Sequence, residues 1–265
     1  RGSIEGISTT QMSVVMASYF GGFLLGSRMV PDMIQKVGHV RVFAALASTI
    51  SAVLVLYAVV PRWEIWAIER LIIGFCFSGV YITSESWLNA SATNETRGQA
   101  LSAYMIVQML GIIGAQILMN TADPAGYLLF IIPSVLVSFA FLPILLSAQP
   151  APQFSTIQRM SFATLFRVSP LGCVGIFLMG GVFSAIFGMA SVWGSARGLS
   201  VTEISAFVAA IYIGGLVLQY PVGWLSDHGD RRVIVLALAV LGTLACLATL
   251  MLQPDIWGLL LTAAI

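Results

Sequence analysis

Charged residues are scarce in this sequence. Asp, Glu, Lys and Arg make up only 9% of its 265 residues, whereas 58% are hydrophobic. A soluble domain usually carries about 25% charged residues, so the composition excludes a globular protein with a water-facing surface. The net charge of +1 at pH 7 also argues against nucleic acid as a partner.

Residue types that carry chemistry are equally few. The three cysteines, Cys76, Cys173 and Cys246, lie singly inside apolar runs, which is typical of small buried residues and not of a disulfide or metal site. The only two histidines, His39 and His228, lie in charged turns without an acidic cluster. The Gly-x-x-x-x-Gly-Lys-Ser/Thr motif that binds ATP phosphates is absent. We therefore expect no cofactor and no metal.

The sequence is rich instead in apolar runs of the length that crosses a bilayer core, which is about 20 helical residues. A further apolar segment begins at Ile256 and reaches the last residue. Since the first residue is Arg1 and not Met, we expect an internal piece of a longer protein. The sequence predicts an all-α membrane protein with spans at 8–29, 42–60, 66–88, 98–120, 127–147, 170–191, 204–225 and 233–252.

Part of the sequence occurs twice. The segment 6–13 resembles the segment 198–205 after a shift of 192 residues, and the similarity continues through Gly22 and Gly214. It ends at Glu64-Ile65-Trp66 and Asp255-Ile256-Trp257, after one residue of slippage. Such repeats indicate two related halves, which in membrane proteins often enclose a substrate site at their interface.

A polar stretch at 148–169 is the natural linker between these halves. We predict an N-terminal bundle of five spans at 1–147, and a C-terminal bundle of three spans and the start of another at 170–265. Eight Lys and Arg residues lie in loops on the linker side and four on the other side. By the positive-inside rule, the linker is cytoplasmic and the first residue lies outside.

The sharpest local motif is a charged turn between two of the predicted spans. It carries Gly223, Asp227, Arg231 and Arg232 in the pattern Gly-x-x-x-Asp-x-x-x-Arg-Arg. This pattern resembles the cytoplasmic loop motif of the major facilitator superfamily. An earlier copy keeps Lys36, Gly38 and Arg41 but has Pro31 and Gln35 where the family has glycine and aspartate.

Other motifs follow in the order of that family. Arg70-x-x-x-Gly74 resembles the arginine motif of its fourth helix, and Glu85 and Arg97-Gly98 resemble the charged ends of its fourth and fifth helices. Glu85-Ser86-Trp87-Leu88 is most similar to the YcaD-type subgroup of bacterial transporters. The resemblance implies a fold of two pseudo-symmetric bundles, of which this chain holds family helices two to the beginning of ten.

We expect the charged residues at the inner ends of the spans to form a cytoplasmic gate that holds one conformation and breaks in the other. A partly exposed ion pair contributes only about 0.2–1 kcal/mol, but several together bias a two-state equilibrium. The alternative is static anchoring of the topology. The gate residues are Lys36, Gly38, Arg41, Glu85, Arg97, Gly223, Asp227, Arg231 and Arg232.

Glu69 and Arg70 are the ionisable residues predicted inside the membrane, where function is the default interpretation. Arg70 shares a helical stripe with Gly74, Phe77 and Tyr81, and Glu69 points about 100° away. Arg70 could bind an anionic group of a substrate or modulate a proton-carrying acid, and Glu69 could be that acid. The alternatives are an arginine that snorkels outward and a glutamate at a frayed helix end.

Polar stripes on other spans are a second candidate for the substrate path. Tyr104 and Gln108 align on one span, and Tyr212 and Gln219 on another. These side chains either line a cavity or make hydrogen bonds between helices. The pairs Gly22/Gly26 and Gly111/Gly114 are predicted to be close-packing sites.

The sequence therefore predicts a secondary active transporter of a small molecule, which works by alternating access and is not an enzyme. Without an ATP motif, an ion gradient is the expected energy source, and we expect protons.

The partners are the small-molecule substrate, protons and the lipid bilayer, and the protein is expected to be a monomer in the bacterial inner membrane. A non-transporting sensor or scaffold on the same fold fits the same features. An intramembrane lipid-modifying enzyme would need clustered Asp, His or Cys near one face.

Overall fold

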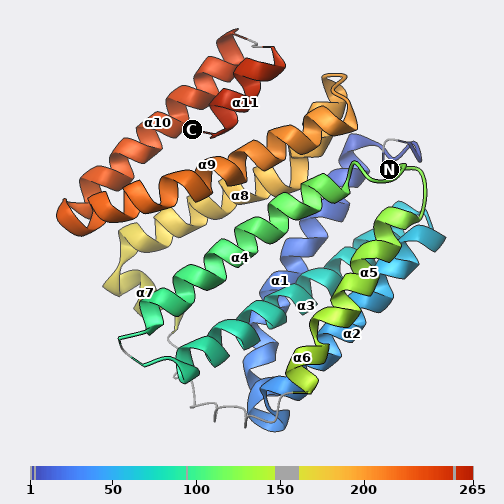
Figure 1. The fold of residues 1–265 in the computed structure, drawn as a ribbon, viewed down its shortest axis with the longest axis horizontal. Coiled ribbons are helices and arrows are strands. Elements are labelled where there is room, and N and C mark those ends of the chain that lie inside the picture. The colour runs from blue at the N-terminus through green and yellow to red at the C-terminus, as the bar shows by residue number, and fades with distance from the viewer. Residues whose placement is uncertain (1, 3, 94, 147–160, 253–254, 265) are drawn as a thin grey trace. The chain divides into compact units, whose positions relative to one another are not determined.

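The computed structural model describes residues 2, 4–93, 95–146, 161–252 and 255–264, and leaves out the side chains of 187–188, 226–227 and 231. Every element in these residues is a helix (Figure 1). The helices are α1 (Thr9–Val37), α2 (His39–Val59), α3 (Trp63–Ser91), α4 (Arg97–Leu118), α5 (Leu128–Ala140), α6 (Leu142–Leu145), α7 (Phe162–Val168), α8 (Pro170–Ala196), α9 (Val201–His228), α10 (Arg231–Leu252) and α11 (Ile256–Ala264).

The predicted all-α membrane fold is confirmed. Among the described residues, seven helical segments are long and apolar enough to cross a membrane, with α5 and α6 counted together. The number is eight if α7 and α8 form one broken span. Each of the eight predicted spans therefore coincides with a helix, although several helices extend beyond the predicted ends.

The first helix is longer than predicted because it runs through a proline. The predicted span ended at residue 29, whereas α1 continues through Pro31 to Val37. Val30 and Ile34 on either side of the proline are fully buried, and their packing holds the backbone helical although Pro31 lacks the N–H for one helical hydrogen bond. The chain reverses only at Gly38, whose φ of 86° favours glycine.

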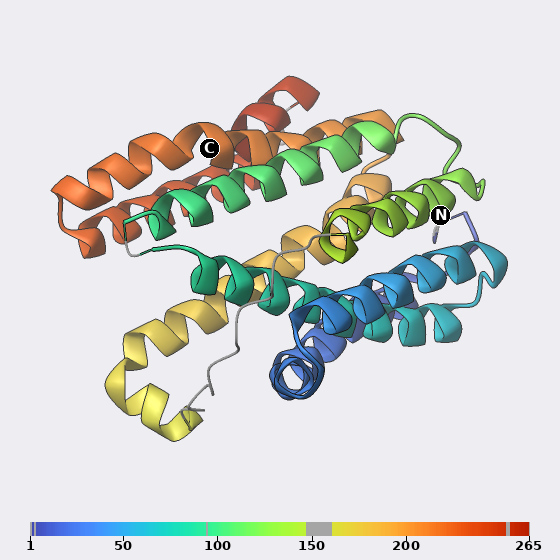
Figure 2. The same ribbon diagram turned by 60° about the horizontal axis from the view of Figure 1, so that its bottom comes forward.

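The end of the predicted linker is helical. Ser161 caps α7 by accepting a hydrogen bond from the backbone N–H of Thr164. This short helix meets α8 at a bend of 112° (Figure 2). Pro170, the first residue of α8, follows the bend, and a proline is well tolerated at the start of a helix. Residues 148–160 of the predicted linker lie outside the described residues.

The chain divides into two compact units. The first contains Arg1–Leu101 with Asp123–Trp193, and the second contains Ser102–Ala122 with Gly194–Ile265. The predicted boundary between the bundles at 148–169 stays a prediction.

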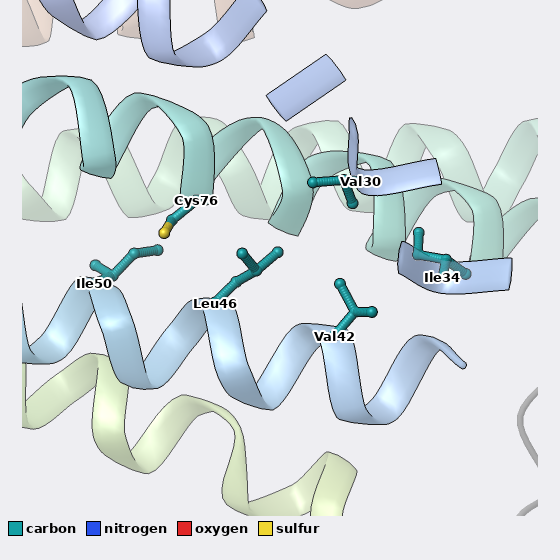
Figure 3. Close-up of a cluster of buried hydrophobic side chains, with 6 residues drawn as sticks. All are labelled: Val30, Ile34, Val42, Leu46, Ile50 and Cys76. Atoms are coloured by element: carbon teal, nitrogen blue, oxygen red, sulfur yellow. The ribbon is translucent and has the colours of Figure 1, made fainter. Parts of the chain in front are cut away.

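The core of the first unit lies between α1, α2 and α3. Figure 3 shows one buried cluster, in which side chains from α1 and α2 meet Cys76 of α3. Because lipid tails are as apolar as these side chains, close packing holds the helices together more than hydrophobic burial does. The cluster consists of Val30, Ile34, Val42, Leu46, Ile50 and Cys76.

Polar contacts join α2 to α5 in the same unit. The Ser51 hydroxyl lies 2.8 Å from the Ser134 hydroxyl and 2.9 Å from the Ser138 hydroxyl. The Ser134 hydroxyl also donates to the Ser51 carbonyl oxygen at 2.9 Å. These contacts satisfy groups that would otherwise be unpaired in an apolar environment.

Glycines allow α1 and α3 to touch along their backbones. A Cβ at Gly22 would collide with the Leu71 carbonyl, and one at Gly26 would lie 2.9 Å from Ser78 Cβ. Gly74 faces the Tyr19 carbonyl in return. The close packing predicted at Gly22 and Gly26 is thus confirmed.

The close packing predicted on α4 is not seen. A Cβ at Gly111 or Gly114 would meet no described atom within 4 Å. Helical spacing of small residues permits a close approach but does not create a neighbour.

In the second unit, α9 packs on α11 through Gly214, where a Cβ would collide with the Ala264 carbonyl. A hydrogen bond of 3.1 Å between the Thr249 and Thr262 hydroxyls joins α10 to α11. The α9–α11 contact therefore reuses the glycine packing of α1 on α3, at the position that the sequence repeat assigns to Gly22.

The two copies of the repeat begin in the same way. Ser8 and Ser200 each cap their helix through a capping box, whose side chain at the third position is Gln11 in one copy and Glu203 in the other. Two residues before each serine, Gly6 and Gly198 have φ values of 71° and 77°. The sequence repeat is therefore a structural repeat at its helix starts.

Candidate functional site

Helix α3 carries both candidate ionisable residues of the membrane interior. Its N-terminal end is exposed, and Arg62 pairs there with Glu64 at 3.6 Å. Glu64 lies in the first turn, where a negative charge complements the helix dipole. Arg70 follows seven residues after Trp63, about 10 Å along the helix axis.

Arg70 points toward α1. Its Nη2 lies 3.4 Å from Met16 Sδ, and its guanidinium carbon lies 5.9 Å from the centroid of the Tyr19 ring. Both contacts are with soft, uncharged partners, a thioether and an aromatic face. In the part of the chain that the structure describes, Arg70 makes no ion pair.

Glu69 points to a different environment. Only 5% of its surface is exposed, and its Oε2 has no hydrogen-bond partner among the described residues. The buried Trp66 Nε1, one turn earlier on the same helix face, also has none. A buried acceptor and a buried donor without partners are costly, so this face of α3 suits a proton or a small polar ligand.

Tyr57 of α2 packs against Trp66. Its ring lies 5.8 Å from Trp66 and stacks on Phe130 at 6.1 Å, and its hydroxyl donates to the Trp66 carbonyl oxygen at 3.2 Å. Both Glu69 and Arg70 lie close enough to act on it electrostatically. Sequence reasoning did not single out Tyr57 or Trp66, because their role depends on the pairing of α2 with α3.

Aromatic rings continue inward from Arg70 along α1 and α3. Tyr19 and Phe23 lie 6.1 Å apart, Phe23 and Tyr81 6.3 Å apart, and Tyr81 and Phe77 6.2 Å apart. All four are partly buried. The predicted stripe of Arg70, Phe77 and Tyr81 is thus part of a larger aromatic surface that includes α1.

The polar stripes of the second unit lie on α4 and α9. A Cβ at Gly215 would lie 3.9 Å from Met109 Cε, so the face of α9 that carries Tyr212 and Gln219 approaches α4. Tyr104, Gln108, Tyr212 and Gln219 are all partly buried. The Gln219 Oε1 atom is buried, and no described residue donates to it.

The end of the first unit where α1 meets α2 is organised around His39, the first residue of α2. Its Nε2 lies 3.1 Å from the Ser86 hydroxyl, and its ring lies 5.8 Å from Trp87. Because the Ser86 hydroxyl donates to the Thr83 carbonyl oxygen, it is placed to accept from His39 Nε2–H. His39 directly follows the turn at Gly38, as predicted, but it is only 2% exposed, which the sequence did not indicate.

The charged gate residues of this unit lie near the ends of α1, α2, α3 and α4. Lys36, Arg41, Glu85 and Arg97 are exposed, and in the described ranges none of them makes an ion pair. Gly38 forms the turn between α1 and α2. The predicted gate stays a prediction.

The second gate turn is shorter than the motif. Gly223 lies inside α9, which continues to His228, and the turn comprises Gly229 and Asp230. A Cβ at Gly223 would meet no described atom within 4 Å, and the helix continues past it, beyond the predicted end of the span at residue 225. The backbone N–H of Arg232 donates to Asp230 Oδ1 at 2.8 Å. The Asp227 and Arg231 side chains lie outside the described residues.

Comparison with known proteins adds independent information. Residues 4–265 match the family model described as Major Facilitator Superfamily. A relative from Salmonella heidelberg (strain SL476) is 26% identical over 258 residues, which cover 95% of this chain and 67% of the relative. A relative from Escherichia fergusonii is 26% identical over 262 residues, which cover 96% of this chain and 68% of the relative. Both bear the name "Uncharacterized MFS-type transporter YcaD". These matches confirm the resemblance found in the motifs.

Proposed function

We propose, on the premise that this chain belongs to the Major Facilitator Superfamily, that it moves a small molecule across the membrane by alternating access. It is a multi-pass integral membrane protein and a transporter of the YcaD type. The mechanism, the coupling ion and the residues of the path are the proposal.

The observation that carries the proposal is the structural repeat. Gly6 and Gly198 share a positive φ, and Ser8 and Ser200 share a capping box. Two bundles with the same internal arrangement can pack together in two alternative ways. The two packings have similar energies, because tilting one bundle against the other replaces contacts at one end with equivalent contacts at the other end.

Protons drive transport in this proposal, and Glu69 carries them. A carboxyl group that is 95% buried, with one oxygen unpartnered among the described residues, is more easily accommodated when it is neutral. Arg70 on the neighbouring face acts on the substrate, and Tyr104, Gln108, Tyr212 and Gln219 on α4 and α9 are the further candidates for the path.

The charged turns act as the cytoplasmic gate, and the protein works as a monomer in the bacterial inner membrane without catalysing a reaction. The gate is supported by the clustering of Gly38, His39 and Ser86 at one end of the first unit. A cytoplasmic position of the linker is supported by the distribution of Lys and Arg.

The test uses the complete protein in liposomes loaded with the pH indicator pyranine. A panel of organic acids, amino acids and sugars is added outside, and the expected result is proton movement with one class of solute and none in empty liposomes. Radiolabelled solute of that class should accumulate under an imposed pH gradient. Accumulation that is indifferent to collapse of the gradient by nigericin would reject proton coupling, and no movement of any solute would reject transport.

A further inference from the structure

We propose that Arg70 binds the anionic group of the transported solute, and that this solute is an organic anion with an aromatic or apolar body. The proposal rests on the proposed transport function and adds the substrate class. The observation behind it is a partly buried guanidinium inside a membrane-spanning helix that has no counter-ion among the described residues.

The guanidinium does not snorkel toward the membrane surface. Gly74, one turn further along α3, faces the Tyr19 carbonyl, which fixes the level of α3 relative to the parallel helix α1. Arg70 contacts Met16 and Tyr19, which lie at its own level, and not the first turn of α1. The side chain is therefore held at depth, where an unneutralised charge is expensive.

Most of its hydrogen-bonding capacity is available. A guanidinium has five N–H donors in a planar fork. The described residues offer it only the Met16 thioether, which is a weak acceptor, and the face of the Tyr19 ring. A carboxylate or phosphonate would fit the fork with two parallel hydrogen bonds.

The acids of α3 do not neutralise this charge. Glu64 pairs with Arg62 at the exposed end of the helix, and Glu85 is exposed near the other end, 15 residues after Arg70. Glu69 is adjacent in the chain but is buried on the face of α3 that carries Trp66, and among the described residues it forms no ion pair with Arg70. An external anion is therefore the natural counter-ion, and it gains most from a site with little competing water.

The apolar part of the ligand is expected from the neighbouring rings. Tyr19, which lies under the guanidinium, begins the row that continues through Phe23 and Tyr81 to Phe77. Partly buried rings favour a flat apolar body through edge and stacking contacts. The cation at one end and the rings beyond it favour an amphipathic anion over an inorganic ion or a sugar.

The test measures binding of matched probes to the complete purified protein by isothermal titration calorimetry. Benzoate and 2-naphthoate are the anions, benzamide and 2-naphthamide are their neutral counterparts, and benzamidine is the cation. We expect the wild type to bind the two carboxylates. Its affinity for the amides and the amidine should be lower by about tenfold or more, which is the loss in affinity expected when one charge-assisted hydrogen bond is missing.

Three variants locate the site. Arg70→Gln should lower the affinity for both carboxylates by about tenfold or more, and Arg70→Lys, which keeps the charge but not the fork, should restore part of it. Arg62→Gln, at the exposed end of the same helix, should bind as the wild type does. Circular dichroism and thermal unfolding identify a variant that fails to fold, in which case Arg70→Lys and the probe series on the wild type carry the test.

The proposal is overturned if the wild type binds neither carboxylate, if it binds the amides or benzamidine equally well, or if Arg70→Gln leaves carboxylate binding unchanged. Transport is judged separately in liposomes. Accumulation of a neutral or cationic solute would reject the anion class and leave the transporter intact. Carboxylate binding that depends on Arg70 without movement of any solute would support the site and reject transport.

Discussion

Two adjacent residues of α3 have opposite charges and different environments. Glu69 is buried on the face of α3 that carries Trp66, and Arg70 lies beside Met16 and Tyr19. Helical geometry separates the two side chains by about 100°. The proposed proton carrier and the proposed anion-binding residue therefore have separate surroundings, as the proposed coupling of proton and solute requires.

The first prediction concerns Glu69→Gln. If Glu69 carries the proton, the amide should abolish accumulation driven by a pH gradient but preserve solute exchange at equal pH, because exchange needs no net proton movement. Uptake and counterflow of labelled solute in proteoliposomes measure the two activities.

The matched control for this change is Glu64→Gln. Glu64 is on the same helix but is exposed at the surface, so this variant should accumulate solute as the wild type does. If Glu69→Gln still concentrates solute under a pH gradient, the proton carrier is a different residue.

At the residue scale, the sequence predicts which side chains are unusual but not what surrounds them. Ionisable residues in an apolar run identify Glu69 and Arg70 without any structure. Trp66 and Tyr57 are ordinary aromatic residues in sequence, and only the packing of α2 against α3 brings them together. The burial of His39 was not predicted for the same reason, since Ser86 and Trp87, which contact it, lie on another helix.

At the scale of helices, glycine fixes the crossing of α1 and α3. We expect Gly22→Ala to destabilise the protein by about 1–3 kcal/mol, as overpacking does, because the new methyl group would collide with the Leu71 carbonyl. Thermal unfolding of the complete protein in detergent measures the effect.

The neighbouring glycine provides the control. A Cβ at Gly21 would meet no described atom within 4 Å, so Gly21→Ala should be neutral or stabilising by up to about 1 kcal/mol through helix propensity. Equal midpoints for the two variants would show that the close contact at Gly22 does not hold in solution.

Helix boundaries were predicted less well than helices. Apolar runs predict the spans, but the predicted ends at residues 29 and 225 fall short of α1 and α9, which continue to Val37 and His228. Burial of Val30 and Ile34 overrides the local effect of the proline. The helix α7 was missed because a run of seven residues with mixed polarity gives no clear periodicity.

The gate is tested at the ends of these helices. Glu85→Gln and Asp227→Asn should change the transport rate, or the balance of inward- and outward-facing states, more than they change expression. The physical reason is that charges that pair in one conformation only alter the equilibrium between conformations. Initial uptake rates and expression levels, compared in the same cells, provide the measurement.

Glu95→Gln is the matched control, because Glu95 is an exposed acid in the turn between α3 and α4. It should leave both quantities unchanged. If both gate variants transport at the wild-type rate, the charged turns do not act as a gate and serve only to anchor the topology.

At the scale of the whole molecule, the repeat explains why so few sequence signals predict so much of the fold. Gly6 and Gly198, Ser8 and Ser200, and Gly22 and Gly214 each have the same structural role in their own copy. A motif that is unclear in one copy is therefore supported by the other. The relation between the copies in space depends on long-range contacts that local sequence does not specify.

The last prediction concerns orientation, which follows from the excess of Lys and Arg on the linker side. Single cysteines are introduced at Thr121, in the exposed turn before α5, and at Ala163, on exposed α7, after the native cysteines are replaced by alanine. A membrane-impermeant maleimide should label Thr121→Cys in intact spheroplasts and label Ala163→Cys only after permeabilisation. Labelling of both variants after permeabilisation establishes that each thiol is reactive. The opposite pattern would invert the topology, and labelling of both from outside would mean that the segment Leu128–Leu145 does not cross the membrane.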